Sequence, residues 1–260
     1  MTIIFYLLIG ATAGFLSGLI GIGGGIIIVP CLLAVFHFLH FNSPDLMQIV
    51  VSTSFAVIAI TTIYSFRSHQ SSQLPYQPLF YQLLPGVVLG SICGAVIAHH
   101  INSDYLKHIF GGMMLLNAML MIYPYSKSTH KHPSKKNLSL AGYIIGNICG
   151  MLGIGGSAFI MPYLNYYQVD LHLAVIISLG ISIAISAVSL ITYFITGVHA
   201  HGLPVHTIGY IYWPAWITII IGSYLCAPLG ARLSQQISAN VLRRIYAVFL
   251  LILGVNMIFF

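Results

Sequence analysis

A glycine-rich stretch that occurs twice is the feature that most restricts how this chain can fold. Residues 18–30 read GLIGIGGGIIIVP, and residues 150–162 repeat the pattern as GMLGIGGSAFIMP, with Ser157 in the place of Gly25. Inside a helix each glycine costs about 1 kcal/mol relative to alanine, yet irregular backbone is not tolerated where it faces lipid. We therefore expect each copy to be a break in a membrane helix, buried in protein or beside a water-filled cavity. Brought together, the two breaks would form a transport site.

Composition indicates a membrane protein. Of the 260 residues, 58% are hydrophobic and 5% are charged, whereas a soluble domain carries about 25% charged residues. The acidic residues are Asp45, Asp104 and Asp170, and there is no glutamate. The long apolar runs predict an all-α polytopic membrane protein rather than a barrel of strands with alternating polarity. In such a protein the net charge of +6 reports orientation in the membrane rather than affinity for nucleic acid.

Ten apolar segments follow one another, five on each side of a basic stretch. A helix needs about 20 apolar residues to cross a bilayer, and the pieces beside each glycine stretch are shorter, so we expect eight to ten membrane segments. Residues 1–125 and 139–260 form two transmembrane repeats, joined by a basic linker at 126–138. The expected segments are 2–19, 24–38, 47–66, 80–99, 106–123, 140–152, 156–166, 173–196, 209–229 and 242–259.

Basic residues indicate how the two repeats are related. If each glycine stretch were one uninterrupted span, the nine basic residues would divide five against four between the two sides. If each stretch doubles back, as a broken helix or a re-entrant hairpin, only Lys107 lies opposite the others. The positive-inside rule favours this second arrangement, which makes the repeats inverted. The linker is then cytoplasmic, both termini lie outside, and the membrane is the inner (plasma) membrane of the cell. The residues that share the cytoplasmic side are Arg67, Lys127, Lys131, Lys135, Lys136, Arg232, Arg243 and Arg244.

The glycine stretches have the chemistry of an anion site. A helix that begins at a break in the membrane offers free backbone N–H groups and a partial positive charge, which together bind anions without a charged side chain. Glycine lets an anion approach the backbone closely. The alternative is that the glycines only permit tight helix crossings, and Gly14 and Gly18 fit that alternative well. The candidate binding residues in the two stretches are Gly23, Gly24, Gly25, Gly155, Gly156 and Ser157.

Hydroxyl and amide side chains inside apolar spans are the second group of candidates. A hydroxyl donates to anion oxygens, although in a helix it more often bonds the carbonyl four residues back. A buried amide in a membrane must also find a partner, and Asn147 precedes the second glycine stretch. Histidine is the only group near the spans that titrates close to neutral pH, and no histidine is assigned a role. The candidates are Ser52, Thr53, Ser54, Asn147 and Ser178.

With both glycine stretches in hand, the chain resembles the sulfite exporter TauE/SafE family, also called the four-toluene-sulfonate uptake permease family. The resemblance rests on the signature G-hydrophobic-hydrophobic-G-x-G-G-G/S-x-x-x-x-P in each half, and on Ser52-Thr53-Ser54. It covers the full length of the chain. It implies a permease, or secondary transporter, for a small sulfur-containing anion such as sulfite or an organosulfonate. The residues alone indicate a duplicated membrane permease.

Two other classes of function are weighed against the permease. An intramembrane enzyme needs an activated serine, paired aspartates or an H-E-x-x-H zinc motif, and the absence of glutamate excludes the last of these. An anion channel or a membrane scaffold subunit without coupled transport remains the alternative. We expect no catalytic residue and no cofactor. We also expect no metal, because the four cysteines lack the paired spacing of metal sites. The expected partners are a small anion and the lipid bilayer, with no nucleic acid, and a homodimer is left open.

Overall fold

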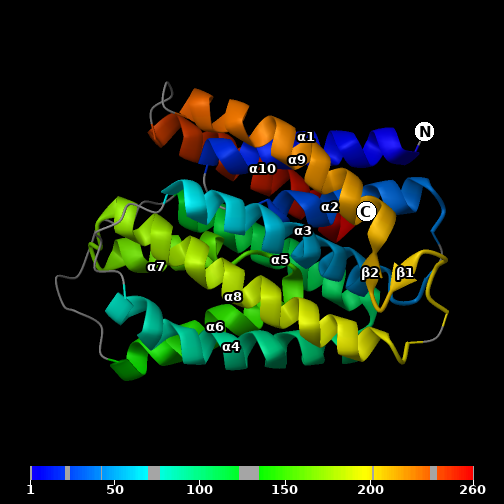
Figure 1. Cartoon of the computed structure of the whole chain (residues 1–260), viewed down its shortest axis with the longest axis horizontal. Coiled ribbons are helices and arrows are strands. Elements are labelled where there is room, and N and C mark those ends of the chain that lie inside the picture. Colours follow the sequence, from blue (N-terminus) through cyan, green and yellow to red (C-terminus); the bar gives the residue numbers. More distant parts are fainter. Residues whose placement is uncertain are drawn as a thin grey trace.

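The chain folds into helices joined by short connections, with one small hairpin. The computed structural model describes residues 2–20, 24–41, 43–69, 77–122, 135–200, 202–234 and 239–259. The hairpin joins β1 (Thr207–Ile208) to β2 (Ile211–Tyr212), which pair in antiparallel fashion. The described helices are α1 (Thr2–Ile20), α2 (Gly25–Phe38), α3 (Leu46–His69), α4 (Gln77–His100), α5 (Ser103–Ile122), α6 (Lys135–Leu152), α7 (Ser157–Tyr166), α8 (Leu171–Gly197), α9 (Trp213–Ser234) and α10 (Ala239–Phe259) (Figure 1).

The length and composition of these helices confirm the class of fold. Within the described residues, α1, α3, α4, α8 and α9 are each long and apolar enough to cross a bilayer. Shorter apolar stretches run through α2, α6 and α10. The chain is therefore an all-α polytopic membrane protein, with large apolar side chains such as Leu89, Ile191 and Ile252 exposed on its outside. In a membrane these side chains face lipid.

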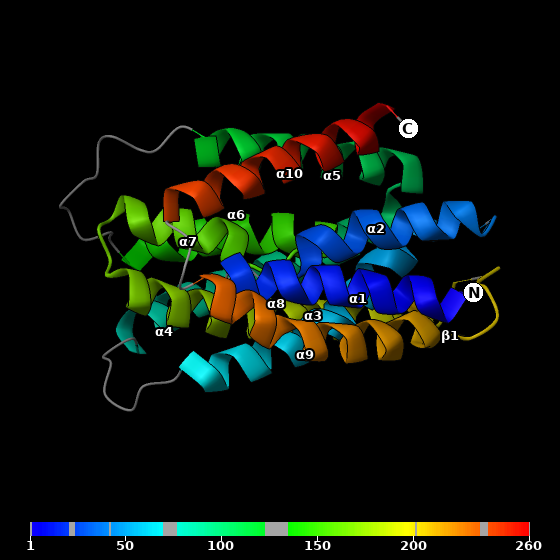
Figure 2. The ribbon, with the colours of Figure 1, turned by 90° about the horizontal axis from the view of Figure 1, so that it is seen from above.

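The helices lie roughly along one direction, so the molecule has two ends (Figures 1 and 2). We call the end where α1 begins and α10 finishes the terminus end, and the end where α5 finishes and α6 begins the linker end. The helices α3, α5 and α9 run from the terminus end to the linker end, whereas α4, α6, α8 and α10 run the opposite way. From the middle of the molecule, α2 runs toward the terminus end and α7 toward the linker end.

Helix packing follows a reciprocal pattern between the two halves of the chain. The first helix of each half packs along the fourth helix of the other, as α1 on α9 and α4 on α6, while α3 packs on α8 and α5 on α10. Small residues at these crossings let the helix backbones approach closely, as is common between membrane helices. Gly14 lies against the backbone of Ser223, as expected from the sequence, and Gly90 lies against that of Tyr143. This is the contact pattern that a two-fold relation between the halves produces.

The centre of the bundle is formed by α3 and α8. Their facing side chains are fully buried and apolar, including Phe55 of α3 and Ile181 of α8. The same two helices also carry most of the buried hydroxyls. Those hydroxyls belong to Ser52, Thr53, Ser54 and Thr62 on α3, and to Ser178, Ser182, Ser186 and Ser189 on α8.

One expected boundary is wrong. The sequence predicts a span from residue 209, but α9 begins at Trp213. Gly209 and Tyr210 form the turn of the hairpin, and Gly209 has a φ of +58°, a conformation that glycine adopts without strain. The apolar residues Ile211 and Tyr212 belong to strand β2. Both residues are as hydrophobic as those of a membrane span, but Tyr212 is buried and Ile211 half-buried in the strand, and neither belongs to α9.

Candidate functional site

Each glycine stretch ends one helix and starts another, as the sequence predicts. The helix α2 begins at Gly25 and α7 begins at Ser157. The carbonyl of Gly24 accepts the N–H groups of Ile27 and Ile28, both at 3.0 Å. In the second stretch, the carbonyl of Gly156 accepts equivalent bonds from the first turn of α7. Both helices therefore start in the middle of the molecule and point toward opposite ends (Figure 1).

The two breaks touch each other. A Cβ added to Gly25 would lie 2.6 Å from the carbonyl oxygen of Gly153 and 3.3 Å from the backbone nitrogen of Gly155. It would also overlap the side chain of Ile58 on α3, which packs over Gly155 as well. Only a residue without a side chain fits at position 25, because backbone from the other half of the chain occupies that space. Two stretches more than a hundred residues apart thus form one site.

The second break is shaped by Gly153. Its φ is +71°, in the left-handed region that glycine adopts readily and other residues rarely do. Residues 152–158 are all buried. The Ser54 hydroxyl of α3 donates a hydrogen bond of 3.0 Å to the Gly153 carbonyl. A predicted site residue of the first half therefore holds the backbone of the second break.

A serine of α8 caps the start of α7. The backbone N–H of Ser157 donates to the Ser182 hydroxyl at 2.9 Å. The Ser182 hydroxyl in turn donates to the Ser178 carbonyl at 2.8 Å. Within the described residues, the Ser178 hydroxyl bonds the carbonyl of Val175 in its own helix. The sequence places Ser182 one helical turn after Ser178 in the same apolar span, but Ser182 is not among the predicted binding residues, and the structure adds it.

The remaining predicted residues include one in the second break, Gly156, and one outside it, Asn147. Gly156 lies against the side chains of Ile160, Ile181 and Ile185. Asn147 lies on the side of α6 that crosses α4, where its backbone meets Gly90 and Gly94. Gly23 lies outside the described residues.

The two other α3 candidates lie beside Ser54 and have different partners. Thr53 donates to the Ile49 carbonyl in its own helix and accepts the backbone N–H of Tyr212 at 3.0 Å. Ser52 is fully buried, and within the described residues its hydroxyl has no protein partner. Residues 52–54 therefore link two parts of the molecule: Ser54 bonds the second break, and Thr53 bonds the hairpin.

The hairpin covers the centre of the molecule from the terminus end. Tyr212 packs against an aromatic cluster, with its ring 5.4 Å from those of Phe36 and Phe41 and 6.2 Å from that of Tyr6. Through Thr53, the strand is also bonded directly to the hydroxyl-rich part of α3. These contacts attach the hairpin to α3 and to the aromatic cluster.

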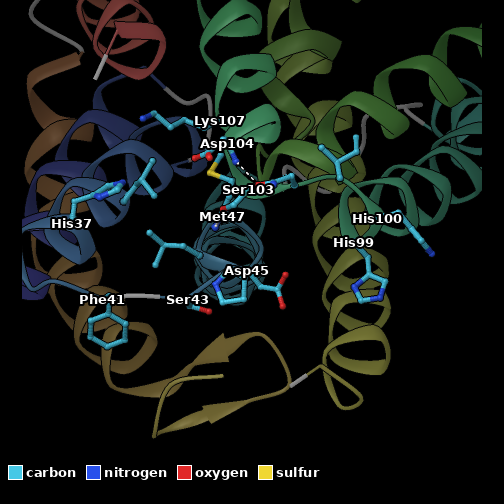
Figure 3. A pocket seen from close by; sticks show the side chains of 15 residues that line it. His37, Phe41, Ser43, Asp45, Met47, His99, His100, Ser103, Asp104 and Lys107 are labelled. Atoms are coloured by element: carbon cyan, nitrogen blue, oxygen red, sulfur yellow. Dashed lines mark hydrogen bonds between the residues drawn. The ribbon is translucent and has the colours of Figure 1, made fainter. Parts of the chain in front are cut away.

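A cavity of about 550 Å³ lies at the terminus end, outside this cover (Figure 3). It is formed by the last turn of α2, the start of α3, the end of α4 and the start of α5. Its polar lining includes His37, Asp45, His99, Asp104 and Lys107. Sequence reasoning gave these residues no role, because they are scattered along the chain and the turns between helices bring them together.

A smaller cavity of about 60 Å³ lies beside Gly24, between α1, α3 and α9. Its lining surface is mainly apolar, although Ser17, Thr61 and Tyr64 are among the lining residues. The first break therefore borders a small, mostly apolar cavity, whereas the Gly25 contact itself is filled by protein. Groups of three or more His, Cys, Asp or Glu suited to hold a metal ion do not occur among the described residues.

These features define a class: a polytopic α-helical membrane protein in which two broken helices meet at the centre of the bundle. The family model of the sulfite exporter TauE/SafE matches residues 6–257, and the chain belongs to this family. It is similar over nearly its whole length to a "Probable membrane transporter protein" of Haemophilus influenzae, with 31% identity over 98% of this chain and 97% of the relative. Another relative is a "Probable membrane transporter protein" of Methanocaldococcus jannaschii, with 28% identity over 97% of this chain and 94% of the relative. The chain is thus a membrane transporter.

Proposed function

We propose that this chain is a permease, a secondary transporter that carries a small sulfur-containing anion such as sulfite or an organosulfonate. The anion would bind near the middle of the bilayer, where the two glycine breaks meet. The observation that carries the proposal is the contact of Gly25 with Gly153 and Gly155. It joins the starts of two helices from different halves of the chain in one buried place.

The chemistry of this place suits an anion. The first N–H groups of a helix have no acceptor within the helix, and the helix dipole adds partial positive charge. The starts of α2 and α7 both supply such groups, and the residues there are small, so no bulky side chain covers the backbone. The described basic residues lie toward helix ends, as Arg67, Lys107 and Arg232 show. An anion held at the breaks would therefore be bound by backbone and hydroxyl groups, without a permanent ion pair to hinder its release.

Alternating access follows from an inverted repeat. We propose that the halves are related in this way, because equivalent helices run in opposite directions and exchange partners, as α1 on α9 and α4 on α6. In transporters with such repeats, one half rocks against the other around a central site. The buried contact at Gly25 favours this mechanism over a passive channel, since a channel needs a continuous water path.

We also propose that the linker end is cytoplasmic and that the membrane is the inner (plasma) membrane. Arg67 and Arg232 lie near the ends of α3 and α9 at the linker end, and Arg244 lies in the first turns of α10 at the same end. Lys107 lies at the terminus end. The positive-inside rule then assigns the linker end to the cytoplasm.

The function is tested with purified protein in liposomes. We expect saturable uptake of labelled sulfite, thiosulfate or an alkanesulfonate above that of protein-free vesicles, with chloride as the comparison anion. If a panel of sulfur oxyanions and sulfonates shows neither flux nor binding, the proposal is wrong. If flux grows linearly with concentration and does not saturate, the channel alternative replaces the permease.

The orientation is tested by cysteine labelling of intact cells. A cysteine at position 131 in the linker is expected to stay unlabelled by an impermeant maleimide added outside. A cysteine in place of Tyr105, whose side chain is 71% exposed at the terminus end, is the matched control and is expected to react. The reverse result would overturn the proposed orientation.

A further inference from the structure

The turn of the hairpin carries a buried tyrosine that joins three separate segments. Tyr210 is fully buried. Its hydroxyl lies 2.9 Å from Nδ1 of His99, in the last turn of α4, and donates to Oδ2 of Asp45, just before α3, at 3.5 Å. Figure 3 shows Asp45 and His99 on the side of the cavity that faces the hairpin. The hairpin is therefore tied to the bundle by a polar chain as well as by its aromatic contacts.

The bond that the Tyr210 hydroxyl donates to Asp45 sets the direction of the hydrogen bonds in this polar chain. Burial raises the pKa of the Tyr210 hydroxyl well above its ordinary value, and the negative charge of Asp45 raises it further, so the hydroxyl keeps its proton at neutral pH. A carboxylate only accepts hydrogen bonds, so this proton goes to Asp45. The hydroxyl oxygen is then left to accept from Nδ1–H of His99. A proton added to His99 completes a charge-assisted chain from imidazolium through tyrosine to carboxylate.

The other titratable groups near the His99–Tyr210–Asp45 hydrogen bonds come from α4, α8, α2 and α5. On α4 itself, His100 has its ring 5.1 Å from that of His99, but its Nδ1 bonds the Val96 carbonyl in its own helix. Behind Tyr210, α8 contributes Tyr193, with a ring distance of 6.3 Å. Across the cavity, α2 contributes His37, and α5 contributes Asp104 and Lys107. The titratable partners of Tyr210 within the described part of the chain are therefore His99, Asp45 and the ring of Tyr193.

We propose that His99, Tyr210 and Asp45 form a proton-binding site that latches the hairpin closed over the transport site at the terminus end. The inference rests on the proposed function, since it assigns a coupling ion to that transporter. When His99 binds a proton, the latch gains a charge-assisted hydrogen bond and the terminus end stays closed. When the proton leaves, the bond from His99 to Tyr210 is no longer charge-assisted, only the bond from Tyr210 to Asp45 remains so, and the hairpin opens more readily.

The latch is connected to the centre of the molecule. The ring of Tyr210 packs on Tyr193, and the Tyr193 hydroxyl donates to the carbonyl of Met151 at 3.3 Å. Met151 lies in the second glycine stretch, two residues before Gly153. The same hairpin is bonded to Thr53 through Tyr212. Opening the hairpin therefore disturbs contacts of both α3 and the second break.

By thermodynamic linkage, proton binding at the latch is coupled to opening and closing of the terminus end. If closure at the terminus end favours proton binding, proton binding favours closure by the same factor. Opening at that end then releases a proton, and anion exchange there is accompanied by proton movement. The anion itself needs no contact with the latch, because both act on one conformational equilibrium.

The test measures the hairpin directly, in the full chain in lipid nanodiscs. Hydrogen exchange of the amides in residues 207–212 is converted to protection factors, which removes the intrinsic pH dependence of exchange. We expect protection about tenfold higher at pH 5.5 than at pH 8, the size of one charge-assisted hydrogen bond. Tyr210→Phe, which keeps the ring, and Asp45→Asn are expected to abolish this pH dependence. His100→Gln, beside His99, is the matched control and is expected to retain it.

Flux measurements separate this inference from the proposed function. In liposomes with an internal pH dye, wild-type protein is expected to move protons during anion flux, and Tyr210→Phe to move the anion with about tenfold less proton movement. If no anion is carried but the hairpin protection depends on pH as described, the latch stands and the proposed function falls. If protection is the same at both pH values, or if Tyr210→Phe and Asp45→Asn respond to pH as the wild type does, the latch is overturned.

Discussion

The two glycine breaks have the same sequence pattern but are held differently. At the second break, Ser182 of α8 caps the N–H of Ser157. In the pairing of the two repeats that matches Ser54 with Ser178, the residue equivalent to Ser182 is Ile58 of α3. Ile58 packs its side chain against Gly25, the residue equivalent to Ser157. One helix start is thus met by a hydroxyl and the other by an aliphatic side chain.

This difference makes the two helix starts unequal as anion sites. An anion that approaches α7 must compete with the Ser182 hydroxyl for the N–H of Ser157. At α2, Gly24 has no side chain with which to cap the helix, so no side-chain hydroxyl of the cap residue competes with an anion there. We therefore expect the first break to supply more of the binding energy, and the second break to supply the rigid wall against which Gly25 rests.

The largest effect is expected from filling the contact between the breaks. Gly25→Val places its side chain on the backbone of Gly153, and overpacking of this kind costs about 3 kcal/mol. We expect anion flux to be lost and the thermal unfolding midpoint in detergent to fall. Gly112→Val is the matched control, because Gly112 of α5 has no neighbour within 4 Å of an added Cβ. Equal behaviour of the two variants would mean that the breaks do not meet in the working protein.

The next largest effect is expected from a substitution at Gly153. Comparing it with the same substitution at Gly202 distinguishes backbone strain in the second break from backbone strain elsewhere. Gly153→Ala forces a side chain into the left-handed region at a cost of about 1–2 kcal/mol, and its Cβ would also lie 3.0 Å from the backbone of Val51. Gly202→Ala is the control, since Gly202 has a φ of +78° but open space around it. We expect both variants to lower the unfolding midpoint and only Gly153→Ala to lower flux. Normal flux in Gly153→Ala would remove the second break from the site.

Much of the fold could be predicted because the membrane imposes simple rules on the sequence. Apolar length gave the long helices to within a few residues, and glycine clusters between apolar runs gave the starts of α2 and α7. The hairpin escaped prediction because Ile211 and Tyr212 are as apolar as a span. Hydropathy alone does not separate a buried two-residue strand from the first turn of a helix.

The site could be predicted in part, for a related reason. The glycine signature indicates where the backbone breaks, and both breaks were predicted to lie together. Which hydroxyl reaches which break depends on the rotation of α3 and α8 about their axes, which the sequence does not fix. The bonds of Ser54 and Ser182 to the second break therefore emerge only from the structure, while the predicted Asn147 lies on the crossing of α6 with α4. The His99–Tyr210–Asp45 chain joins three distant segments and has no local signature.

A smaller effect is expected from removing the cap that distinguishes the second break. Ser182→Ala leaves the N–H of Ser157 without this acceptor, and loss of a helix cap costs about 1 kcal/mol. We expect the unfolding midpoint to fall by about 2–4 °C while flux is retained, because the first break supplies the stronger anion site. A loss of flux as large as that of Gly25→Val would contradict this ranking and make α7 the main binding helix.

The smallest effect compares Ser54 with Ser178, the two serines that the proposed alignment of the halves pairs. Ser54→Ala removes the hydrogen bond to the Gly153 carbonyl, for which we expect a loss of about 1 kcal/mol. Ser178→Ala removes only a bond to Val175 in the same helix, a type of bond that adds little to helix stability, so its midpoint is expected to match that of the wild type. Because both serines are fully buried, the pair is matched in burial and in the atoms deleted. Equal losses of stability in the two variants would show that the cost comes from burial of a hydroxyl and not from the hydrogen bond of Ser54 to Gly153. The two halves would then be stabilised in the same way.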